Sequence, residues 1–127
     1  MIEVVETGIA KSKGPVSGAV IGTGARTLYM AVIPKDPQSG AIVNGDIETQ
    51  ARQTFANMKQ TVEAAGGTLK DMAQVLIYLI EGSDAAAMNK VYGEFFSAPY
   101  PNRATVVVKE LLAPGMRIEV VAHAALP

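Results

Sequence analysis

The sequence contains no cysteine and no tryptophan, and its only histidine is His123. The absence of cysteine excludes disulfide bridges, thiolate metal ligands and a cysteine nucleophile. A single imidazole without acidic or thiol neighbours is a poor metal site, so His123 is interpreted as a surface or interface residue. We therefore expect neither a bound metal nor a cofactor.

Charged residues are also scarce, at 18% of the chain, against about 25% in an average domain. Lysine and arginine are scattered, and their densest cluster is the short KSK segment at 11–13. Without a basic stripe to neutralise phosphates, nucleic acid is not favoured as a partner. No apolar run approaches the roughly 18 residues of a membrane span, so we expect a cytoplasmic protein with no membrane partner.

Hydrophobic residues are abundant and make up 49% of the 127 residues. One composition runs throughout, which predicts a single domain over 1–127. A chain of this size can bury a core without disulfides or metals. A sequence poor in charge and rich in alanine and valine also suggests that part of its surface is covered by a subunit partner.

The segment 46–67 has the clearest helical pattern. Asp46 can cap the first turn, and Gly66 with Gly67 can end the helix in a left-handed conformation. The apolar positions recur at steps of three and four and form one stripe: Ile47, Ala51, Phe55, Met58, Val62 and Ala65. A second helix is predicted from Ser83 or Asp84 to Phe96.

Apolar runs bounded by turn residues predict six strands, at 2–5, 19–21, 27–33, 72–80, 103–108 and 116–124. The resulting order of strands and helices predicts an α+β two-layer sandwich, with one sheet and both helices on one of its faces. The other face carries too many valine, isoleucine and alanine residues for contact with water. We expect this face to be buried against other copies of the chain in a closed ring.

Arg103 stands at the entrance of the penultimate strand and is the first candidate for chemistry. A guanidinium binds a carboxylate through two parallel N–H donors. Since consecutive strands with a short connection usually lie side by side, Glu119 of the last strand is expected near Arg103, or near it across a subunit boundary. The pair could bind a small acid and activate water for hydrolysis. Alternatively, the two residues pair with each other, or with solvent, for structure only.

Four segments together carry a family resemblance: GDIETQARQTFANMKQTVEAAGGTLKDM, VYGEFF, PNRATV and MRIEVVAHAAL. They resemble the reactive intermediate deaminase family (RidA, formerly YjgF), which also carries the label endoribonuclease L-PSP. The likeness extends over about 14–125. It implies a chorismate-mutase-like fold of the bacillus type, a homotrimer whose sheets form a barrel, and sites in the clefts between subunits.

The resemblance also implies an activity: hydrolysis of 2-enamino and 2-imino acids, such as 2-aminoacrylate, to 2-keto acids and ammonia, as in 2-iminobutanoate/2-iminopropanoate deaminases. By position, Arg103 would hold the substrate carboxylate, and Glu119 would orient or activate the attacking water. Thr105 would border the pocket where many relatives have cysteine. Asn89 matches the asparagine of the N-x-x-Y-x-x-F-F helix of the family.

Two positions depart from the family pattern. Val16 replaces the tyrosine of a Gly-Pro-Tyr segment, and Met30 begins the apolar triplet that replaces Ser-Gly-Gln. The pocket should therefore be drier and should accept another side chain, or turn over slowly. A non-catalytic module that binds or senses 2-keto acids is the alternative. RNA cleavage has little support, because the chain lacks a basic patch and an aromatic stacking platform with cationic neighbours.

Overall fold

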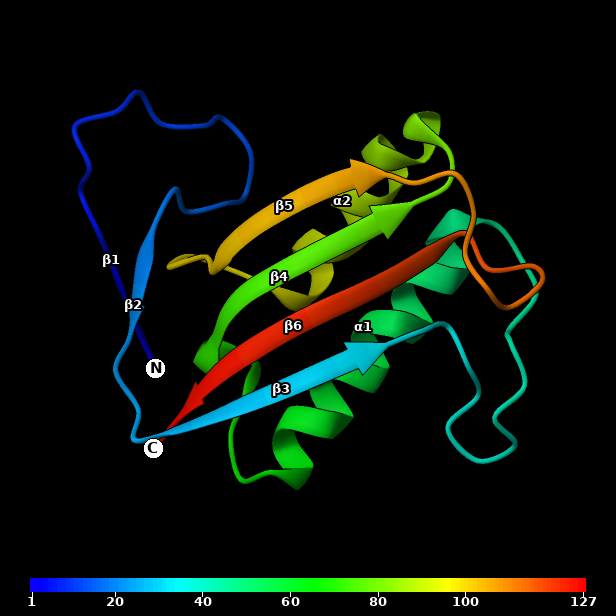
Figure 1. Ribbon diagram of the computed structural model, residues 1–127, viewed down its shortest axis with the longest axis horizontal. Coiled ribbons are helices and arrows are strands. Elements are labelled where there is room, and N and C mark those ends of the chain that lie inside the picture. The colour runs from blue at the N-terminus through cyan, green and yellow to red at the C-terminus, as the bar shows by residue number, and fades with distance from the viewer.

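Two helices lie on one face of a four-stranded sheet in the computed structural model, which describes residues 1–127 (Figure 1). The helices are α1 (Ile47–Ala64) and α2 (Ala85–Phe95). The sheet contains β3 (Arg26–Val32), β4 (Met72–Leu79), β5 (Asn102–Val107) and β6 (Ile118–Leu126). This confirms the predicted α+β arrangement with both helices on one face.

Three short elements complete the chain. Strands β1 (Ile2–Val4) and β2 (Val20–Gly22) pair with each other in a separate two-stranded sheet, rather than joining the main one as predicted. Two single-turn 3-10 helices, η1 (Leu69–Asp71) and η2 (Gly82–Asp84), precede β4 and α2. None of the helices is both long enough and apolar enough to cross a membrane.

Helix α1 begins and ends where the sequence predicts. The side chain of Asp46 accepts a hydrogen bond from the backbone N–H of Thr49 at 2.9 Å, which caps the first turn. Gly66, with φ of +91°, follows the last turn in the left-handed region. Asp84 lies at the start of α2 but makes no capping bond, because its carboxylate binds Arg117 at 2.9 and 3.0 Å instead.

The order of strands in the sheet is β3-β6-β4-β5. Strands β4 and β5 are parallel, and the other two pairings are antiparallel. Helix α2 connects β4 to β5, and a parallel pair needs such a crossover. Strand β6 then pairs with the other side of β4. The expectation that the last two strands are neighbours is therefore wrong, since β4 separates them.

The register shows which side chains share a face. Arg103 lies opposite Val75, and Thr105 lies opposite Ile77, both of which are buried under the helices. Glu119 lies opposite Tyr78, one position along β4, so it projects to the other face. Within one chain, Arg103 and Glu119 are therefore on opposite faces with a strand between them. Their predicted proximity in the same chain is wrong, and only proximity across a subunit boundary remains.

The core lies between the sheet and the two helices. Phe55 of α1 and Tyr92 of α2 are fully buried there, with ring centroids 5.5 Å apart in an edge-to-face arrangement. The opposite face of the sheet, here called the open face, is uncovered in the single chain. Its apolar side chains include Tyr29, which is 73% exposed, and Val106, which is 46% exposed. The prediction of an uncovered apolar sheet face is confirmed.

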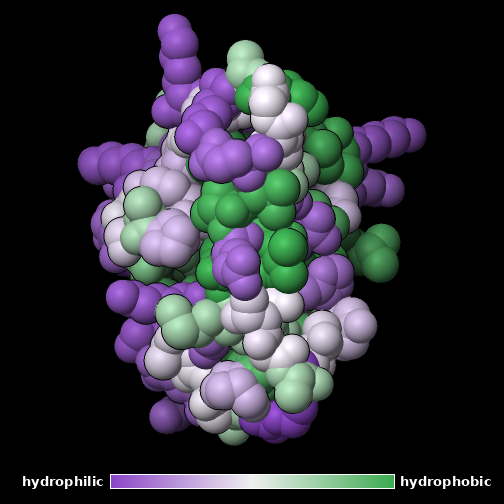
Figure 2. Space-filling view, turned by 90° about the vertical axis from the view of Figure 1, so that its left-hand side faces the viewer, coloured by the Kyte–Doolittle hydropathy of each residue, from purple (hydrophilic) through white to green (hydrophobic).

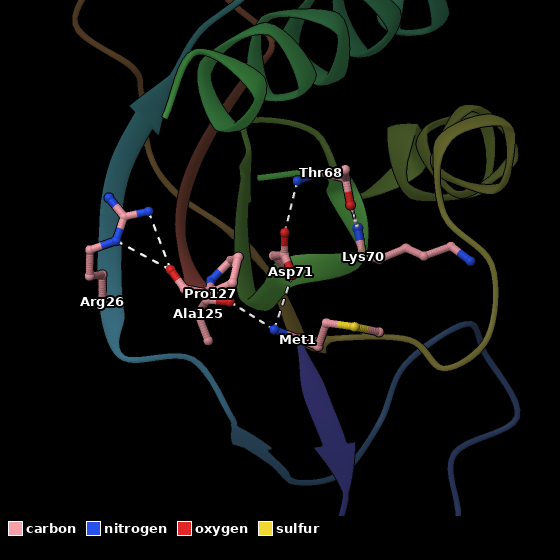
Figure 3. A network of polar contacts seen from close by, with 7 residues as sticks. All are labelled: Met1, Arg26, Thr68, Lys70, Asp71, Ala125 and Pro127. Atoms are coloured by element: carbon pink, nitrogen blue, oxygen red, sulfur yellow. Dashed lines mark hydrogen bonds and ion pairs between the residues drawn. The ribbon is translucent and has the colours of Figure 1, made fainter. Parts of the chain in front are cut away.

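The β1–β2 end of the molecule is held to the rest by its first residue. The Met1 amino group donates a hydrogen bond to the Ala125 carbonyl at 2.8 Å and pairs with an Asp71 carboxylate oxygen at 3.0 Å (Figure 3). The other oxygen of Asp71 accepts from the Thr68 backbone N–H at 2.8 Å. Apolar side chains gather on the surface at this end (Figure 2), where Met1, Val4, Val5 and Ile21 are exposed.

Candidate active site

Arg103 lies on β5, the edge strand of the sheet, with its side chain on the helix-covered face. Its guanidinium carbon is 4.6 Å from the centre of the Tyr92 ring, an arrangement typical of a cation–π contact. The side chain is half-buried, and its Nη1 is fully buried without a hydrogen-bond partner. No carboxylate of the chain lies within ion-pair distance of Arg103.

A partly buried cation without a counter-ion is unfavourable for folding, because desolvation is not offset by a nearby negative charge. Burial lowers the pKa of Arg103, yet a guanidinium stays protonated at neutral pH. The interpretation that Arg103 pairs with Glu119 for structure therefore does not hold within this chain. An unpaired buried donor on a permanent cation is instead the arrangement that binds an anion.

Three further polar atoms are also buried without a hydrogen-bond partner. Throughout the chain, the buried side-chain polar atoms without a partner are Asn89 Oδ1, Tyr92 OH, Arg103 Nη1 and Thr105 Oγ1. Buried polar groups are nearly always hydrogen-bonded in folded proteins, so orphan atoms indicate a missing ligand or water. Two of the four come from α2 and two from β5, and no other element contributes one.

The crossover orients the two residues of α2 and the two residues of β5 in the same direction along the sheet. Asn89 precedes Tyr92 by three residues, so both lie on the same side of α2. Thr105 follows Arg103 by two residues on the same face of β5. Since β4 and β5 are parallel, α2 between them runs against the direction of β5 (Figure 1). Asn89 is thus displaced from Tyr92 toward the same end as Thr105 is from Arg103.

This set of groups can bind a small acid. The guanidinium of Arg103 supplies charge and parallel donors for a carboxylate, and the hydroxyls and the amide can contact the rest of the molecule. Burial raises the pKa of the Tyr92 hydroxyl, so this group is a neutral phenol at physiological pH. The site is therefore positively charged, and its neutral groups do not cancel that charge.

Val16 lies near the entrance of β5. The adjacent Ser17 donates its backbone N–H to the Pro101 carbonyl at 3.2 Å, and Asn102 Nδ2 donates to the Ser17 carbonyl at 3.1 Å. A hollow of about 470 Å³ is lined by Val16, Tyr100 and the segment 4–12, among others. Val16 is thus placed where it can border a ligand that extends from β5 toward this loop.

The other two predicted residues lie elsewhere. Met30 is on β3, at the opposite edge of the sheet, and is 8% exposed within the hydrophobic core. Nothing within one chain supports its predicted contact with substrate. Glu119 is half-buried on the open face and makes no ion pair with another residue of the chain. Of the predicted residues, Arg103 and Thr105 share one face of β5, and Asn89 lies on α2 three residues before Tyr92, whose ring contacts Arg103.

The sequence did not indicate Tyr92 as a candidate site residue, although its hydroxyl is one of the four unsatisfied atoms. Tyr92 lies on the buried side of its helix, together with Met88 and Val91. The sequence did contain one indication: a tyrosine stands on the apolar side of this helix, where phenylalanine would pack equally well without a hydroxyl group to satisfy. Only the structure shows that this ring lies under the guanidinium of Arg103.

The chain is similar in sequence and fold to several known proteins. The family model described as Endoribonuclease L-PSP matches residues 10–126. A RutC family protein of Pyrococcus horikoshii is 44% identical over 112 residues, which cover 87% of this chain and 88% of the relative. A 2-iminobutanoate/2-iminopropanoate deaminase of Dermatophagoides farinae is 40% identical over 100 residues, covering 77% and 76%. The crystal structure of the Rid-family protein YyfB from Yersinia pestis matches with a TM-score of 0.87 at 25% identity, over 98% of both chains.

The fold is thus that of a small α+β protein of the Rid type. The chain belongs to the endoribonuclease L-PSP family, which includes the RutC and Rid proteins. The resemblance inferred from the sequence is confirmed. Relatives from both a mite and Homo sapiens carry the deaminase name, so the family includes imine deaminases.

Proposed function

We propose that the protein hydrolyses 2-imino acids, and the 2-enamino acids that tautomerise to them, to 2-keto acids and ammonia without a cofactor. The observation that carries the proposal is the half-buried guanidinium of Arg103, which has no carboxylate partner and packs on Tyr92, while α2 and β5 carry the three other unsatisfied polar atoms. Membership of a family that contains deaminases supports the reaction class. The carboxylate of the substrate would complete the missing ion pair.

The reaction needs little beyond positioning. With the carboxylate bound to Arg103, water adds to the imine carbon, and the new C–O bond gives a tetrahedral adduct. The imine nitrogen receives one proton of the water on addition and the hydroxyl proton as the C–N bond breaks, and it leaves as ammonia. One imine and one water become one keto group and one ammonia, with no change of oxidation state. Holding the reactants in place lowers the entropic part of the barrier.

A second copy of the chain would complete the site. Arg103 lies on an edge strand and is only half-buried, whereas Glu119 projects from the apolar open face. In the proposed homotrimer, a chorismate-mutase-like barrel, the open face of one copy covers the β5 edge of the next. Glu119 of the partner subunit would then face Arg103, where a carboxylate can orient water and transfer protons.

The first prediction concerns assembly. We expect light scattering to give three times the 13.3 kDa mass of one chain, because the apolar open face is too large to remain in water. Replacing the exposed Val106 by aspartate should shift the mass toward one chain, since association would bury the new carboxylate. A wild-type protein that is monomeric at micromolar concentration would contradict both the trimer and the shared site.

The second prediction concerns turnover. An amino acid oxidase generates a 2-imino acid, semicarbazide traps it, and the protein should slow formation of the semicarbazone by hydrolysing the imine first. Glu119→Gln should lower kcat by about 100-fold, the lower end of the usual contribution of a general base. No effect of the wild-type protein on trapping, together with measurable binding of 2-ketobutyrate, would identify the non-catalytic binding module instead.

A further inference from the structure

Tyr92 carries a hydroxyl that packing alone does not explain. The residue is fully buried, its ring stacks on Phe96 with centroids 4.4 Å apart, and it meets Phe55 edge to face. Phenylalanine occupies the neighbouring positions of this aromatic cluster and packs there without a polar atom. A buried hydroxyl without a partner destabilises the fold relative to the same ring without it.

The same ring is the only group observed to support the guanidinium of Arg103. The charge lies 4.6 Å from the ring centre, and no carboxylate of the chain competes for it. A carboxylate in this place would hold the side chain but would also neutralise it. The face of an aromatic ring attracts the cation without cancelling its charge, which stays available to an incoming acid.

We propose that Tyr92 is a positioning residue: its ring holds the guanidinium of Arg103 in the orientation that binds a carboxylate, and its hydroxyl completes the polar lining when an acid is bound. This inference rests on the proposed function, because the acid is the 2-imino acid substrate or its 2-keto acid product. Because the ring and the hydroxyl of Tyr92 have different roles in this proposal, substitutions can test them separately.

Tyr92→Phe keeps the ring and removes the hydroxyl. We expect KM for the imino acid and Kd for 2-ketobutyrate to rise about threefold to tenfold, the range of one neutral hydrogen bond. Thermal stability should stay the same or increase, because an unsatisfied buried group is removed. Tyr92→Leu removes the ring as well. It should raise both constants further, by another factor of about three to ten, the range of a partly desolvated cation–π contact.

A spectroscopic signal tests the positioning directly. In the wild-type protein the Nε–H resonance of Arg103, assigned by its loss in Arg103→Lys, should be shifted upfield by the ring current of Tyr92. The shift should persist in Tyr92→Phe and disappear in Tyr92→Leu. Phe95→Leu is the matched control: it removes another ring that packs on Phe55, three residues along the same helix, and should leave this resonance and both constants unchanged.

The outcomes separate this proposal from the proposed function. If Tyr92→Leu folds and has the KM and Kd of Phe95→Leu, Tyr92 is a core residue only and the proposal is wrong, whatever the turnover. If the wild-type protein binds 2-ketobutyrate but has no deaminase activity, the proposed function fails, and the Kd values alone decide the role of Tyr92. If Tyr92→Leu does not fold, the Kd of Tyr92→Phe decides: a wild-type value contradicts the proposal. Absence of 2-ketobutyrate binding by the wild type would overturn both.

Discussion

Replacing Arg103 by alanine should lower kcat/KM for 2-imino acids by about 10²- to 10⁴-fold while leaving the free energy of unfolding unchanged or slightly higher. Two parallel hydrogen bonds from a charged donor contribute about 1.5–3 kcal/mol each to binding, which corresponds to that loss. Stability should not fall, because no ion pair of the chain involves Arg103 and its half-buried charge is desolvated. Steady-state kinetics and chemical denaturation measure the two quantities.

Arg52→Ala is the matched control for this experiment. Arg52 makes a two-bond ion pair with Glu94 on the surface, at 2.7 and 3.0 Å, and neither residue carries one of the unsatisfied atoms. Its loss should cost at most about 1 kcal/mol of stability and leave kcat/KM unchanged. Arg103→Lys should fall between wild type and alanine, since it keeps the charge but not the planar fork. If Arg103→Ala keeps activity within twofold of wild type, the proposal that Arg103 binds the substrate carboxylate is wrong.

Gln50→Leu should lower the free energy of unfolding by about 3 kcal/mol, the sum expected for three hydrogen bonds in a buried place. Gln50 is 1% exposed, and its amide group donates to the carbonyls of Val43 and Gly115 at 3.0 and 2.8 Å. Its oxygen accepts from the backbone N–H of Arg117 at 2.7 Å. Leucine fills a similar volume but leaves all three backbone groups without this partner.

The measurement is denaturant unfolding followed by circular dichroism at one fixed protein concentration, because the stability of an oligomer depends on concentration. Gln53→Leu on the same helix serves as the comparison, since Gln53 makes only a side-chain contact with Asn57 at 2.9 Å. It should cost less than about 0.5 kcal/mol. Equal stability of the two variants would show that the Gln50 bonds contribute nothing net.

Local elements of this fold could be predicted well from sequence, and α1 shows why. Its apolar stripe, its cap at Asp46 and its stop at Gly66 depend on residues within a few positions of each other. Arg103 and Thr105 share one face of β5 for a similarly local reason, because they are two residues apart on a strand. Such signals are set by the periods of helix and strand and need no knowledge of the rest of the chain.

Strand order could not be predicted in this way. The pattern of β5 and β6 is the same whether they are neighbours or flank a third strand. The structure places β4 between them, which separates Arg103 from Glu119. A general preference for adjacent pairing favoured the wrong arrangement, because a parallel crossover through α2 had already joined β5 to β4.

The site residues stay predictions. The resemblance to a known family singled out Asn89, Arg103 and Thr105, and each of the three has a buried side-chain polar atom without a hydrogen-bond partner. The supporting ring of Tyr92 and the buried hydrogen bonds of Gln50 were missed. Tyr92 and Gln50 both lie on the buried sides of helices. The spacing of apolar residues predicts that such a position is buried, but it does not predict the polar group that the side chain contacts.

All four unsatisfied atoms belong to the β4–α2–β5 unit, and this has a consequence for how the molecule can vary. In the proposed site, the residues that would bind the acid group belong to one contiguous stretch of the chain, whereas Val16 and the covering copy would contribute from outside it. Exchanging those outer parts between relatives should then change which substrate side chain is accepted and leave carboxylate binding intact. On the proposed function, we therefore expect substrate selectivity and carboxylate binding to respond to different substitutions.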